Sequence, residues 1–401
     1  MSDRIVVIGA GQAAVSLIGT LRAEGHAGPI TLIGAEPVLP YQRPPLSKKY
    51  LLGEMSVERL YLKPESWYDE NEIDLILETR VDRIDRENRS VVLESGAQVP
   101  YDKLALTTGS VPRNLPEAVG GGLEGVYTVR DLGHIDHVAP EFDEARRVLI
   151  IGGGYIGLEA AAVAAMRGLK VTVIEMADRI LQRVAAPATA DFIRSMHARN
   201  GVEIRESVGL TRLEGEGRVT RAVLNDGSEL EIDFAIVGIG IMPASGLAEA
   251  AGLAIDNGIA VDSFSSTSDP DVFAAGDCAS FPYRGRRIRL ESVPNAIDQG
   301  ANAALNMMGR QEPYLAKPWF WSDQYDCKLQ IAGLHVGWDN TVTRPGAREG
   351  TQSVWYYAGD TLLAVDAMND ARSYMIGKRV IEAGGTLPKA DVADPDVKLK
   401  P

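Results

Sequence analysis

The chain has 401 residues, of which 45% are apolar and 24% charged, proportions that describe a folded protein of two or three domains. A formal net charge of −14 argues against nucleic acid and anionic membranes as partners, because both are bound by neutralising phosphate with Lys and Arg. The two cysteines, Cys278 and Cys327, provide no disulfide framework and no zinc site, so we expect a reducing compartment, the cytoplasm. The five histidines form no ligand cluster, and we expect no metal. Residues 1–11 lack the pattern of a signal peptide.

The first motif follows an apolar, β-branched strand, Ile5 to Ile8. It reads Gly9-x-Gly11-x-x-Ala14 and continues into a helix of small and apolar residues and a second strand that ends at Glu36. Gly9 permits a tight turn, Gly11 lets the backbone approach a pyrophosphate, and the small Ala14 lets the helix pack closely on the strand. Glu36 is placed to accept a hydrogen bond from a ribose hydroxyl. We predict a dinucleotide site here; an incidental glycine turn is the alternative.

The same pattern occurs a second time. Gly152-x-Gly154-x-x-Gly157 follows the strand Val148 to Ile151, and the next strand, Val171 to Ile174, leads into Glu175. The apolar span 148–165 carries consecutive glycines and Glu159, which favours a strand, a turn and a helix over a membrane span. Two complete fingerprints predict two dinucleotide sites, although a duplicated domain with one inactive site would show the same pattern.

Later motifs extend the pattern over nearly the whole chain, in the order "GAGQAA", "YQRPPLSK", "LALTTGS", "IIGGGYIGLE", "VGIGIMP", "VFAAGDCAS", "ESVPNA" and "PWFWSDQY". With them the chain resembles flavoproteins of the glutathione-reductase fold, most closely the FAD-containing, NADH-dependent ferredoxin reductases that serve cytochrome P450s and aromatic-ring dioxygenases. The resemblance implies an α/β fold with two Rossmann-like dinucleotide-binding domains and a C-terminal α+β domain. It implies FAD in a discontinuous domain of residues 1–112 and 244–320, NADH in residues 113–243, and a C-terminal domain in residues 321–401.

The resemblance also implies that Lys48 lies beside the flavin with Glu159 as its partner, and this pair is the catalytic candidate. A fixed ammonium stabilises negative charge on a reduced flavin, and a carboxylate keeps the lysine charged and oriented. By pattern alone, Lys48 is equally a surface lysine beside Lys49, and Glu159 an acidic residue in the first turns of a helix. The family places Asp277 on the ribityl chain, whose hydroxyls are donors; a helix N-cap is the alternative.

The complete candidate set has two parts. Candidates for FAD binding are Gly9, Gly11, Ala13, Ala14, Ala35, Glu36, Arg43, Lys48, Val81, Thr108, Gly109, Arg130, Asp277, Val293 and Trp319. Candidates for NAD binding are Gly152, Gly154, Tyr155, Ile156, Gly157, Glu175, Arg183, Gly238 and Gly240. Glu175 favours NADH over NADPH, because a carboxylate accepts from a 2′-hydroxyl and repels a 2′-phosphate. Arg179 and Arg183 follow closely, and either is close enough in sequence to reach a 2′-phosphate, which weakens this preference; the NADH pyrophosphate or a helix face is the alternative place for them.

The absence of cysteines from one segment indicates what kind of electron acceptor to expect. Residues 41–49 contain no cysteine, whereas a disulfide reductase of this fold needs a cysteine pair there. Cys278 and Cys327 are interpreted as buried core residues. Electrons from a reduced flavin must then pass to an external carrier, and the family implies a [2Fe-2S] ferredoxin that serves an oxygenase. An NADH oxidase, a rubredoxin or quinone reductase, and a redox-sensing protein resembling apoptosis-inducing factor remain alternatives.

A basic run marks a candidate docking surface for an acidic ferredoxin. The segment "RGRRIR" holds Arg284, Arg286, Arg287 and Arg289, and it is either a solvated hairpin or a docking patch. Arg310, Lys328 and Arg344 are candidates to extend it, and Trp319 and Trp321 either pack in a core or lie between flavin and partner. The Pro-rich, charged segment 387–401 is expected to be a loose tail.

Overall fold

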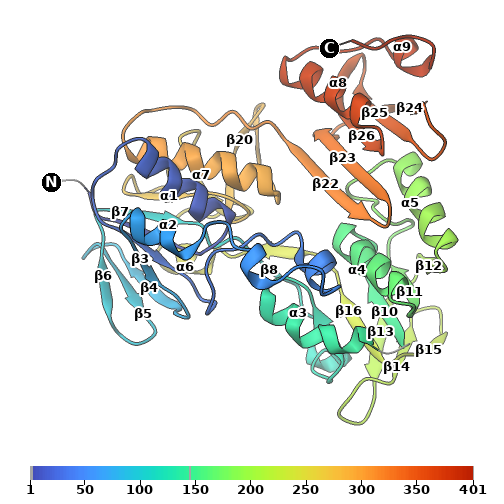
Figure 1. Ribbon diagram of the computed structural model, residues 1–401, viewed down its shortest axis with the longest axis horizontal. Coiled ribbons are helices and arrows are strands. Elements are labelled where there is room, and N and C mark those ends of the chain that lie inside the picture. Colours follow the sequence, from blue (N-terminus) through green and yellow to red (C-terminus); the bar gives the residue numbers. More distant parts are fainter. Residues whose placement is uncertain (1–2, 144–145, 401) are drawn as a thin grey trace. The chain divides into compact units, whose positions relative to one another are not determined.

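The computed structural model describes residues 3–143 and 146–400, which divide into two compact units (Figure 1). The first unit comprises Met1–Arg43, Ser56–Val111 and Ile241–Pro318. The second comprises Pro44–Met55, Pro112–Gly240 and Trp319–Pro401. The chain leaves the first unit in β8 (Ser110–Pro112) and returns in β17 (Ile241–Pro243). Among the helices of the described residues, none is both long enough and apolar enough to cross a bilayer.

A parallel sheet forms the centre of the first unit. Its order is β19-β7-β1-β2-β3, so the strand that precedes the first fingerprint lies in the middle. All four residues of β1 are buried, as expected for a β-branched strand covered on both faces. The strands are β1 (Ile5–Ile8), β2 (Ile30–Ile33), β3 (Ile73–Ile76), β7 (Lys103–Leu106) and β19 (Val272–Ala274).

Helices α1 (Gln12–Ala23) and α7 (Val293–Met307) lie side by side in the first unit (Figure 1). Gly300 allows the two helices to approach closely, because a Cβ at this position would lie 2.4 Å from the backbone oxygen of Ala13. The smaller helices are α2 (Glu65–Glu70), α6 (Gly246–Ala250) and the 3-10 turn η2 (Val57–Arg59). The remaining strands are β4 (Val81–Asp85), β5 (Ser90–Leu93), β6 (Gln98–Pro100), β18 (Ile259–Ala260), β20 (Ala279–Tyr283) and β21 (Arg286–Ile288).

The second unit repeats this plan around the second fingerprint. Its parallel sheet has the order β12-β11-β10-β16-β9, again with the fingerprint strand in the middle. The strands are β9 (Val126–Thr128), β10 (Arg147–Ile151), β11 (Lys170–Glu175), β12 (Glu203–Glu206) and β16 (Phe234–Val237). An antiparallel sheet adds β13 (Leu210–Glu214), β14 (Arg221–Leu224) and β15 (Glu229–Glu231). Both units thus carry a Rossmann-like sheet, and the expected α/β class is confirmed.

The helical elements of this part of the second unit are α3 (Leu132–Val138), α4 (Tyr155–Met166), α5 (Pro187–Arg199), the π-helix η1 (Leu46–Tyr50) and the 3-10 turns η3 (Glu117–Val119) and η4 (Ala139–Asp143). Helix α4 carries apolar or small residues on every side apart from Glu159, and residues 157–164 are all buried. Such a helix belongs in a core rather than on a surface.

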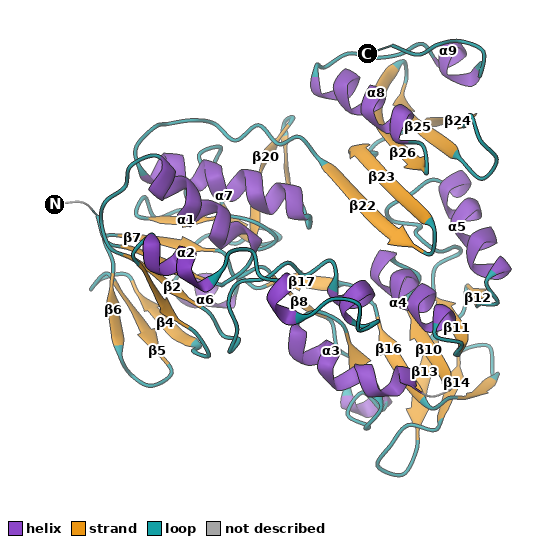
Figure 2. Ribbon diagram, viewed as in Figure 1, coloured by secondary structure: helices purple, strands orange, loops and turns teal. Residues whose placement is uncertain are grey.

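An antiparallel sheet with two helices completes the second unit (Figure 2). Its strands are β22 (Trp319–Gln324), β23 (Cys327–Gly333), β24 (Asn340–Pro345), β25 (Gln352–Ala358) and β26 (Thr361–Met368). Helices α8 (Ala371–Glu382) and α9 (Lys389–Ala393) follow. One apolar cluster joins this sheet to α4 and α5, since Leu158, Ile193, Leu329 and Tyr356 all belong to it.

The C-terminal segment is packed, so the expectation of a loose tail is wrong. The guanidinium of Arg344 on β24 donates to backbone oxygens of Asp391, Val392, Asp394, Pro395 and Val397, at 2.6 to 3.2 Å. Val392 and Leu399 are buried in the apolar cluster of the C-terminal sheet. Composition predicted disorder because it could not show that one arginine binds five backbone oxygens between Asp391 and Val397.

A buried aspartate lies inside the second unit. Asp366 on β26 is fully buried and accepts hydrogen bonds at Oδ2 from Thr189 Oγ1, 2.7 Å away, and from the hydroxyl of Tyr356. Its Oδ1 has no partner among the described residues. Burial raises the pKa of Asp366 to about 6, against the two hydrogen bonds, which lower it.

We predict that Asp366→Asn stabilises the protein at neutral pH but not at pH 4. Between its unfolded pKa of about 3.9 and its folded pKa of about 6, Asp366 keeps its proton in the folded chain and loses it in the unfolded chain. Ionisation therefore weakens the fold as pH rises through this window, by about 3 kcal/mol at its upper end. Asparagine does not ionise. Denaturant unfolding of both proteins from pH 4 to 8 should show their difference growing up to about pH 6 and then staying level.

Asp360→Asn is the matched control, because this exposed aspartate lies in the turn between β25 and β26. A difference between Asp366→Asn and the unmodified protein that is the same at every pH would contradict the assignment.

Candidate functional site

The first fingerprint forms a tight turn at the end of β1. Gly9 has φ +104°, and a Cβ there would lie 2.4 Å from the backbone oxygen of Thr107 at the end of β7. A Cβ on Gly11 would meet nothing within 4 Å, so the backbone of the turn is open where a phosphate would approach. Ala13 and Ala14 are buried in the first turns of α1. The turn lies between β1 and β7, where the strand order reverses and ligands bind in open α/β sheets.

Three more segments of the first unit meet near this turn. Thr108 Oγ1 donates to the backbone oxygen of Ala244 at 2.6 Å, and Ser110 Oγ donates to Asp277 Oδ2 at 2.9 Å. Asp277 caps no helix: strand β20 follows it, and Ser292 is the N-cap of α7. The Oε1 atom of the buried Gln299 on α7 accepts from the backbone N–H of Gly276 at 2.9 Å.

The amide nitrogen of Gln299 is a free donor. It is buried and has no hydrogen-bond partner among the described residues. A buried N–H normally has an acceptor, so this one fits a ligand that brings its own. Together with the open backbone at Gly11, it makes this end of the sheet suitable for a dinucleotide.

Glu36 is not an isolated carboxylate. Arg43 Nη2 lies 2.7 Å from its Oε1, and the hydroxyl of Tyr41 lies 2.5 Å from its Oε2. The guanidinium of Arg43 also lies over the ring of Tyr41, 5.0 Å from its centroid. The structure therefore joins two of the FAD candidates, Glu36 and Arg43, in one ion pair. Strand β2 ends at Ile33, so Glu36 lies three residues beyond the strand, and the prediction that the strand ends at Glu36 is wrong.

The second fingerprint repeats the geometry of the first. Gly152 has φ +112°, and a Cβ there would lie 2.4 Å from the backbone oxygen of Gly238 at the end of β16. A Cβ on Gly154 would meet nothing within 4 Å, whereas one on Gly157 would lie 2.2 Å from the Gly152 oxygen. Ile156, in the first turn of α4, is 48% exposed. An exposed apolar side chain beside an open glycine turn suits a nucleotide with a flat, partly apolar ring.

Glu175 holds the loop of the second fingerprint. Its Oε2 accepts from the backbone N–H of Gly153 and its Oε1 from that of Ala177, both at 2.8 Å. The carboxylate is thereby fixed at the end of β11, with lone pairs left for a further donor. Glu175 thus has a structural task that its position in the motif did not reveal.

The two arginines after Glu175 differ in their surroundings. Arg179 donates to the backbone oxygens of Ile180, Gln182 and Ala185, so its guanidinium is engaged within its own loop. Arg183 is exposed, and a Cβ on Gly240 would lie 3.7 Å from its guanidinium. Of the two, Arg183 is therefore the exposed one, and it lies beside Gly240, another of the NAD candidates.

Lys48 and Glu159 form an ion pair, as the resemblance implied. Lys48 Nζ lies 2.7 Å from Glu159 Oε2 and 3.2 Å from the backbone oxygen of Pro44. Lys48 interrupts η1 with φ −131° and ψ −107°, outside the helical region. The side chain of Lys48 is 18% exposed and that of Glu159 4%, so this pair is far less hydrated than a surface ion pair.

Two hydroxyl groups complete the surroundings of Glu159. Ser322 Oγ donates to its Oε1 at 2.7 Å, and Ser47 Oγ to its Oε2 at 3.3 Å. Burial raises the pKa of Glu159 above its ordinary value, while Lys48, Ser322 and Ser47 each act to lower it. The carboxylate is thus held by three partners inside an otherwise apolar helix.

Further buried polar residues continue from Ser322. Gln324 Nε2 donates to Ser322 Oγ at 3.1 Å, Gln324 Oε1 lies 2.8 Å from His197 Nε2, and the Tyr325 hydroxyl lies 3.2 Å from His197 Nδ1. Ser322, Gln324 and His197 are all at most 2% exposed. Sequence reasoning missed them, although Ser322 and Gln324 in the run Ser322-Asp323-Gln324 share one face of β22 and were a readable signal.

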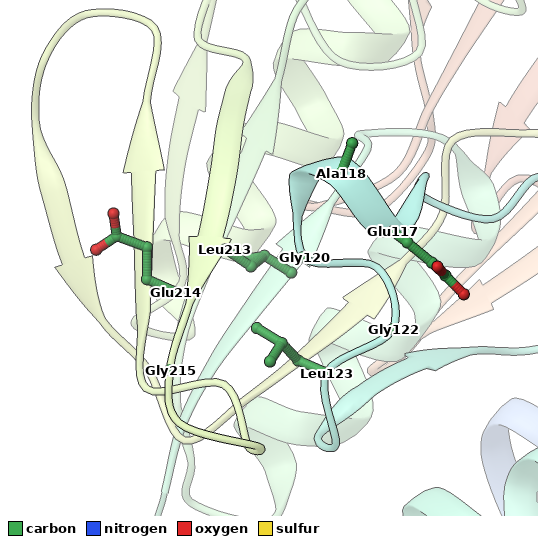
Figure 3. Close-up of a pocket in the computed structure, with 8 residues that line it drawn as sticks. All are labelled: Glu117, Ala118, Gly120, Gly122, Leu123, Leu213, Glu214 and Gly215. Carbon is green, nitrogen blue, oxygen red and sulfur yellow. The ribbon is translucent and has the colours of Figure 1, made fainter.

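The other candidates are spread over both units. Ala35, Val81, Gly109 and Val293 belong to the first unit, whereas Arg130 and Trp319 share the second with Lys48. Trp319 stacks on Trp321 with ring centroids 5.6 Å apart, and Tyr155 packs on Phe320 at 5.0 Å. The pocket in Figure 3 contains none of the candidates. Leu123 and Leu213 point into it, while the side chains of Glu117 and Glu214 point outward.

The four arginines of the basic run fall into two pairs according to what their guanidinium groups contact. Arg284 and Arg286 are exposed at the turn of the β20–β21 hairpin, with Arg284 over the ring of Tyr283 at 5.2 Å. Arg287 donates to the backbone oxygens of Val261 and Ser280, and Arg289 to that of Asp277. Among the residues considered as extensions, Arg310 pairs with Glu24 and Arg344 binds the C-terminal segment.

The cysteines are free and buried. Burial raises the pKa of both thiols, that of Cys327 to about 12, so neither is a ready nucleophile. Within residues 3–143 and 146–400, no group of His, Cys, Asp and Glu side chains is arranged to hold a metal ion.

Comparison with known proteins agrees with this geometry. Residues 3–300 match the family model of pyridine nucleotide-disulphide oxidoreductases, and residues 319–401 match a reductase C-terminal domain. The chain is 42% identical to a ferredoxin–NAD(P)+ reductase of Sphingomonas sp, over 99% of this chain and 96% of that relative. It is 38% identical to putidaredoxin reductase of Pseudomonas putida, over 100% and 96% of the two chains.

Solved structures give the same result. The putidaredoxin reductase chain of a covalent complex with putidaredoxin matches with a TM-score of 0.95 at 38% identity, over 99% of this chain and 97% of that one. A ferredoxin reductase from Rhodopseudomonas palustris also matches with a TM-score of 0.95 at 38% identity, over 99% and 98%. The chain belongs to the pyridine nucleotide-disulphide oxidoreductases, in the branch of the ferredoxin reductases, and its cofactors are FAD and NAD(P)H.

Proposed function

We propose that this flavoenzyme takes electrons from NADH through FAD and passes them singly to a [2Fe-2S] ferredoxin that serves a cytochrome P450 or another oxygenase. The observation that carries the proposal is the buried Lys48–Glu159 pair in a chain whose two cysteines are both buried. Bound FAD supplies the step from two-electron to one-electron chemistry. The relatives that are named ferredoxin reductases support the choice of acceptor.

For the cofactors, we propose the division expected from the sequence. Residues 1–112 and 244–320 hold FAD, residues 113–243 hold the nicotinamide nucleotide, and residues 321–401 form the C-terminal domain. Support for FAD binding in the first part comes from the open backbone at Gly11, the Ser110–Asp277 contact and the unpaired amide of Gln299. Support for the second part comes from the matching turn at Gly152 and Gly154.

Lys48 and Glu159 are the proposed catalytic pair. The lysine ammonium offers positive charge to the flavin, and the carboxylate keeps the ammonium charged and in place through a 2.7 Å contact. Ser47 and Ser322 keep the carboxylate itself from rotating. Because both members of the pair are largely buried, their field is screened far less than that of a surface pair.

For docking, we propose the β20–β21 hairpin, with the exposed Arg284 and Arg286 meeting acidic groups of the ferredoxin. The hairpin is tied to the Asp277 motif by Arg289, which donates to the Asp277 backbone oxygen at 3.1 Å. Salt screens the overall negative charge of the protein beyond about 8 Å, so local arginines set the encounter. We also propose the cytoplasm as the compartment, in keeping with two unpaired cysteines.

We predict that Lys48→Met and Glu159→Gln keep FAD but slow its reduction by NADH. Each variant removes the charge of one member of the pair, and loss of a hydrogen bond to a charged group costs about 1.5 to 3 kcal/mol, or roughly 10- to 100-fold in rate. Stopped-flow reduction and the flavin potential measure the effect. Lys49→Met, the neighbouring lysine, is the control and should behave like the unmodified protein. If flavin reduction rates and flavin potentials are unchanged in both Lys48→Met and Glu159→Gln, the two residues have a structural role only.

We predict a preference for NADH over NADPH that depends on Glu175. The guanidinium of Arg179 is engaged with three carbonyls, whereas Arg183 is exposed and lies beside Gly240. Glu175→Ala should raise the KM for NADH roughly tenfold or more and narrow the preference, measured as the ratio of the two kcat/KM values. Glu203→Ala, on the next strand of the same sheet, is the control. Equal kcat/KM values in the unmodified protein would refute the assignment.

We predict that replacing Arg284 and Arg286 with Ala raises the KM for ferredoxin about fivefold, since exposed ion pairs contribute up to about 1 kcal/mol. The salt dependence of ferredoxin reduction should flatten, while ferricyanide, which needs no docking surface, is reduced at the same rate. Arg80 and Arg83 are exposed on the same unit, and their double Ala variant is the matched control. Ferredoxin turnover with an unaltered salt response would show that docking takes place elsewhere.

A further inference from the structure

The buried residues Ser322, Gln324 and His197 connect Glu159 to the half-buried Tyr325. They come from the C-terminal sheet and from α5, and their contacts are 2.7, 3.1, 2.8 and 3.2 Å in turn from Glu159 Oε1 to the Tyr325 hydroxyl. The ring of His197 also packs edge-on against Tyr325, with centroids 5.2 Å apart. All five residues lie in the second unit.

The charge of Glu159 determines the direction of every bond in this series. An ionised carboxylate only accepts, so Ser322 must donate its O–H to Glu159. Ser322 Oγ then accepts from the Gln324 amide nitrogen, which turns the Gln324 oxygen toward His197. His197 must therefore carry its proton on Nε2, and its bare Nδ1 accepts the hydroxyl of Tyr325.

Neutral histidine suits this place. His197 is fully buried, and burial lowers its pKa. Its ring partners are an amide oxygen and a phenol rather than a carboxylate. The ring therefore has one donor and one acceptor, and both are used.

We propose that Ser322, Gln324 and His197 are positioning residues for the Lys48–Glu159 pair, joined in a one-way series of hydrogen bonds whose direction is set by the negative charge on Glu159. The series keeps one donor on Oε1 of the carboxylate while Lys48 holds Oε2, so the carboxylate cannot turn away from the lysine. The assignment of a positioning role rests on the proposed function, whereas the direction of the series does not.

The test is the tautomer of His197 in the oxidised, FAD-loaded protein, read from the ring nitrogens in a long-range proton–nitrogen NMR experiment on histidine-labelled protein. The chain has five histidines, and His197→Asn identifies the signal. The unmodified protein should carry the proton on Nε2. In Glu159→Gln, the new amide oxygen faces Lys48 and its NH₂ faces Ser322, which reverses each bond in turn. His197 should then carry the proton on Nδ1.

Controls separate this effect from general disturbance. Glu141→Gln changes another buried glutamate of the second unit, one that binds Arg146, Arg218 and Tyr127, and it should leave the His197 tautomer unchanged. Ser322→Ala interrupts the series, so adding Glu159→Gln to Ser322→Ala should make no further difference at His197. A proton on Nδ1 in the unmodified protein, a doubly protonated ring, or an unchanged tautomer in Glu159→Gln would overturn the proposal.

The positioning role has its own readout. Ser322→Ala should slow flavin reduction at saturating NADH about tenfold with little change in the affinity for NADH, and Ser322→Thr, which keeps the hydroxyl, should restore most of the rate. Normal reduction by Ser322→Ala would refute positioning. If the His197 tautomer switches as described but the protein cannot reduce ferredoxin, only the proposed electron acceptor is contradicted.

Discussion

A single negative charge inside an apolar helix organises the second unit. Helix α4 begins at the second fingerprint and is buried from Gly157 to Ala164, and Glu159 lies within that stretch. A carboxylate removed from water is destabilising unless it is paired and hydrogen-bonded, and removing one partner of such a pair costs about 3 to 5 kcal/mol. The partners cannot come from α4 itself. They come from η1, through Lys48 and Ser47, and from β22, through Ser322. One charge thereby draws together three segments that are far apart in the sequence.

The two Rossmann-like sheets form their glycine turns with the same backbone geometry but place differently bonded acidic side chains beside them. In each, the first fingerprint glycine lies against the carbonyl of the facing strand, Thr107 in one case and Gly238 in the other. The acidic residues of the two fingerprints differ: Glu175 ends β11, whereas Glu36 lies three residues beyond β2. Glu36 is held by Arg43 and Tyr41, whereas Glu175 holds backbone N–H groups of its own loop. A duplicated backbone therefore presents two carboxylates of different availability, which suits two different nucleotides.

Features that depend on the spacing of nearby residues were predicted from the sequence, whereas contacts between distant segments were missed. The strands before Gly9 and Gly152, the helices after them and the open glycines were all predicted, because β-branched runs and glycine spacing act over a few residues. The Lys48–Glu159 contact was found only through the resemblance, since 111 positions separate the two residues. Ser322, Gln324 and His197 were missed for the same reason: no short pattern links α5 to β22. The division of the basic run was also out of reach, because it depends on which carbonyls lie beneath Arg287 and Arg289.

The loop that follows β11 limits how the nucleotide preference could be redesigned. Arg179 follows Glu175, the residue proposed to favour NADH, by four positions and looks like a ready cation for a 2′-phosphate, but its guanidinium donates to three backbone oxygens of the segment 180–185. Turning its guanidinium toward a ligand would leave those oxygens without their donor, and Ile180 and Ala185 are themselves buried. A variant designed to prefer NADPH would therefore have to use Arg183, the exposed arginine of the same loop, or a basic residue introduced from outside the loop, with Arg179 left in place as a structural residue.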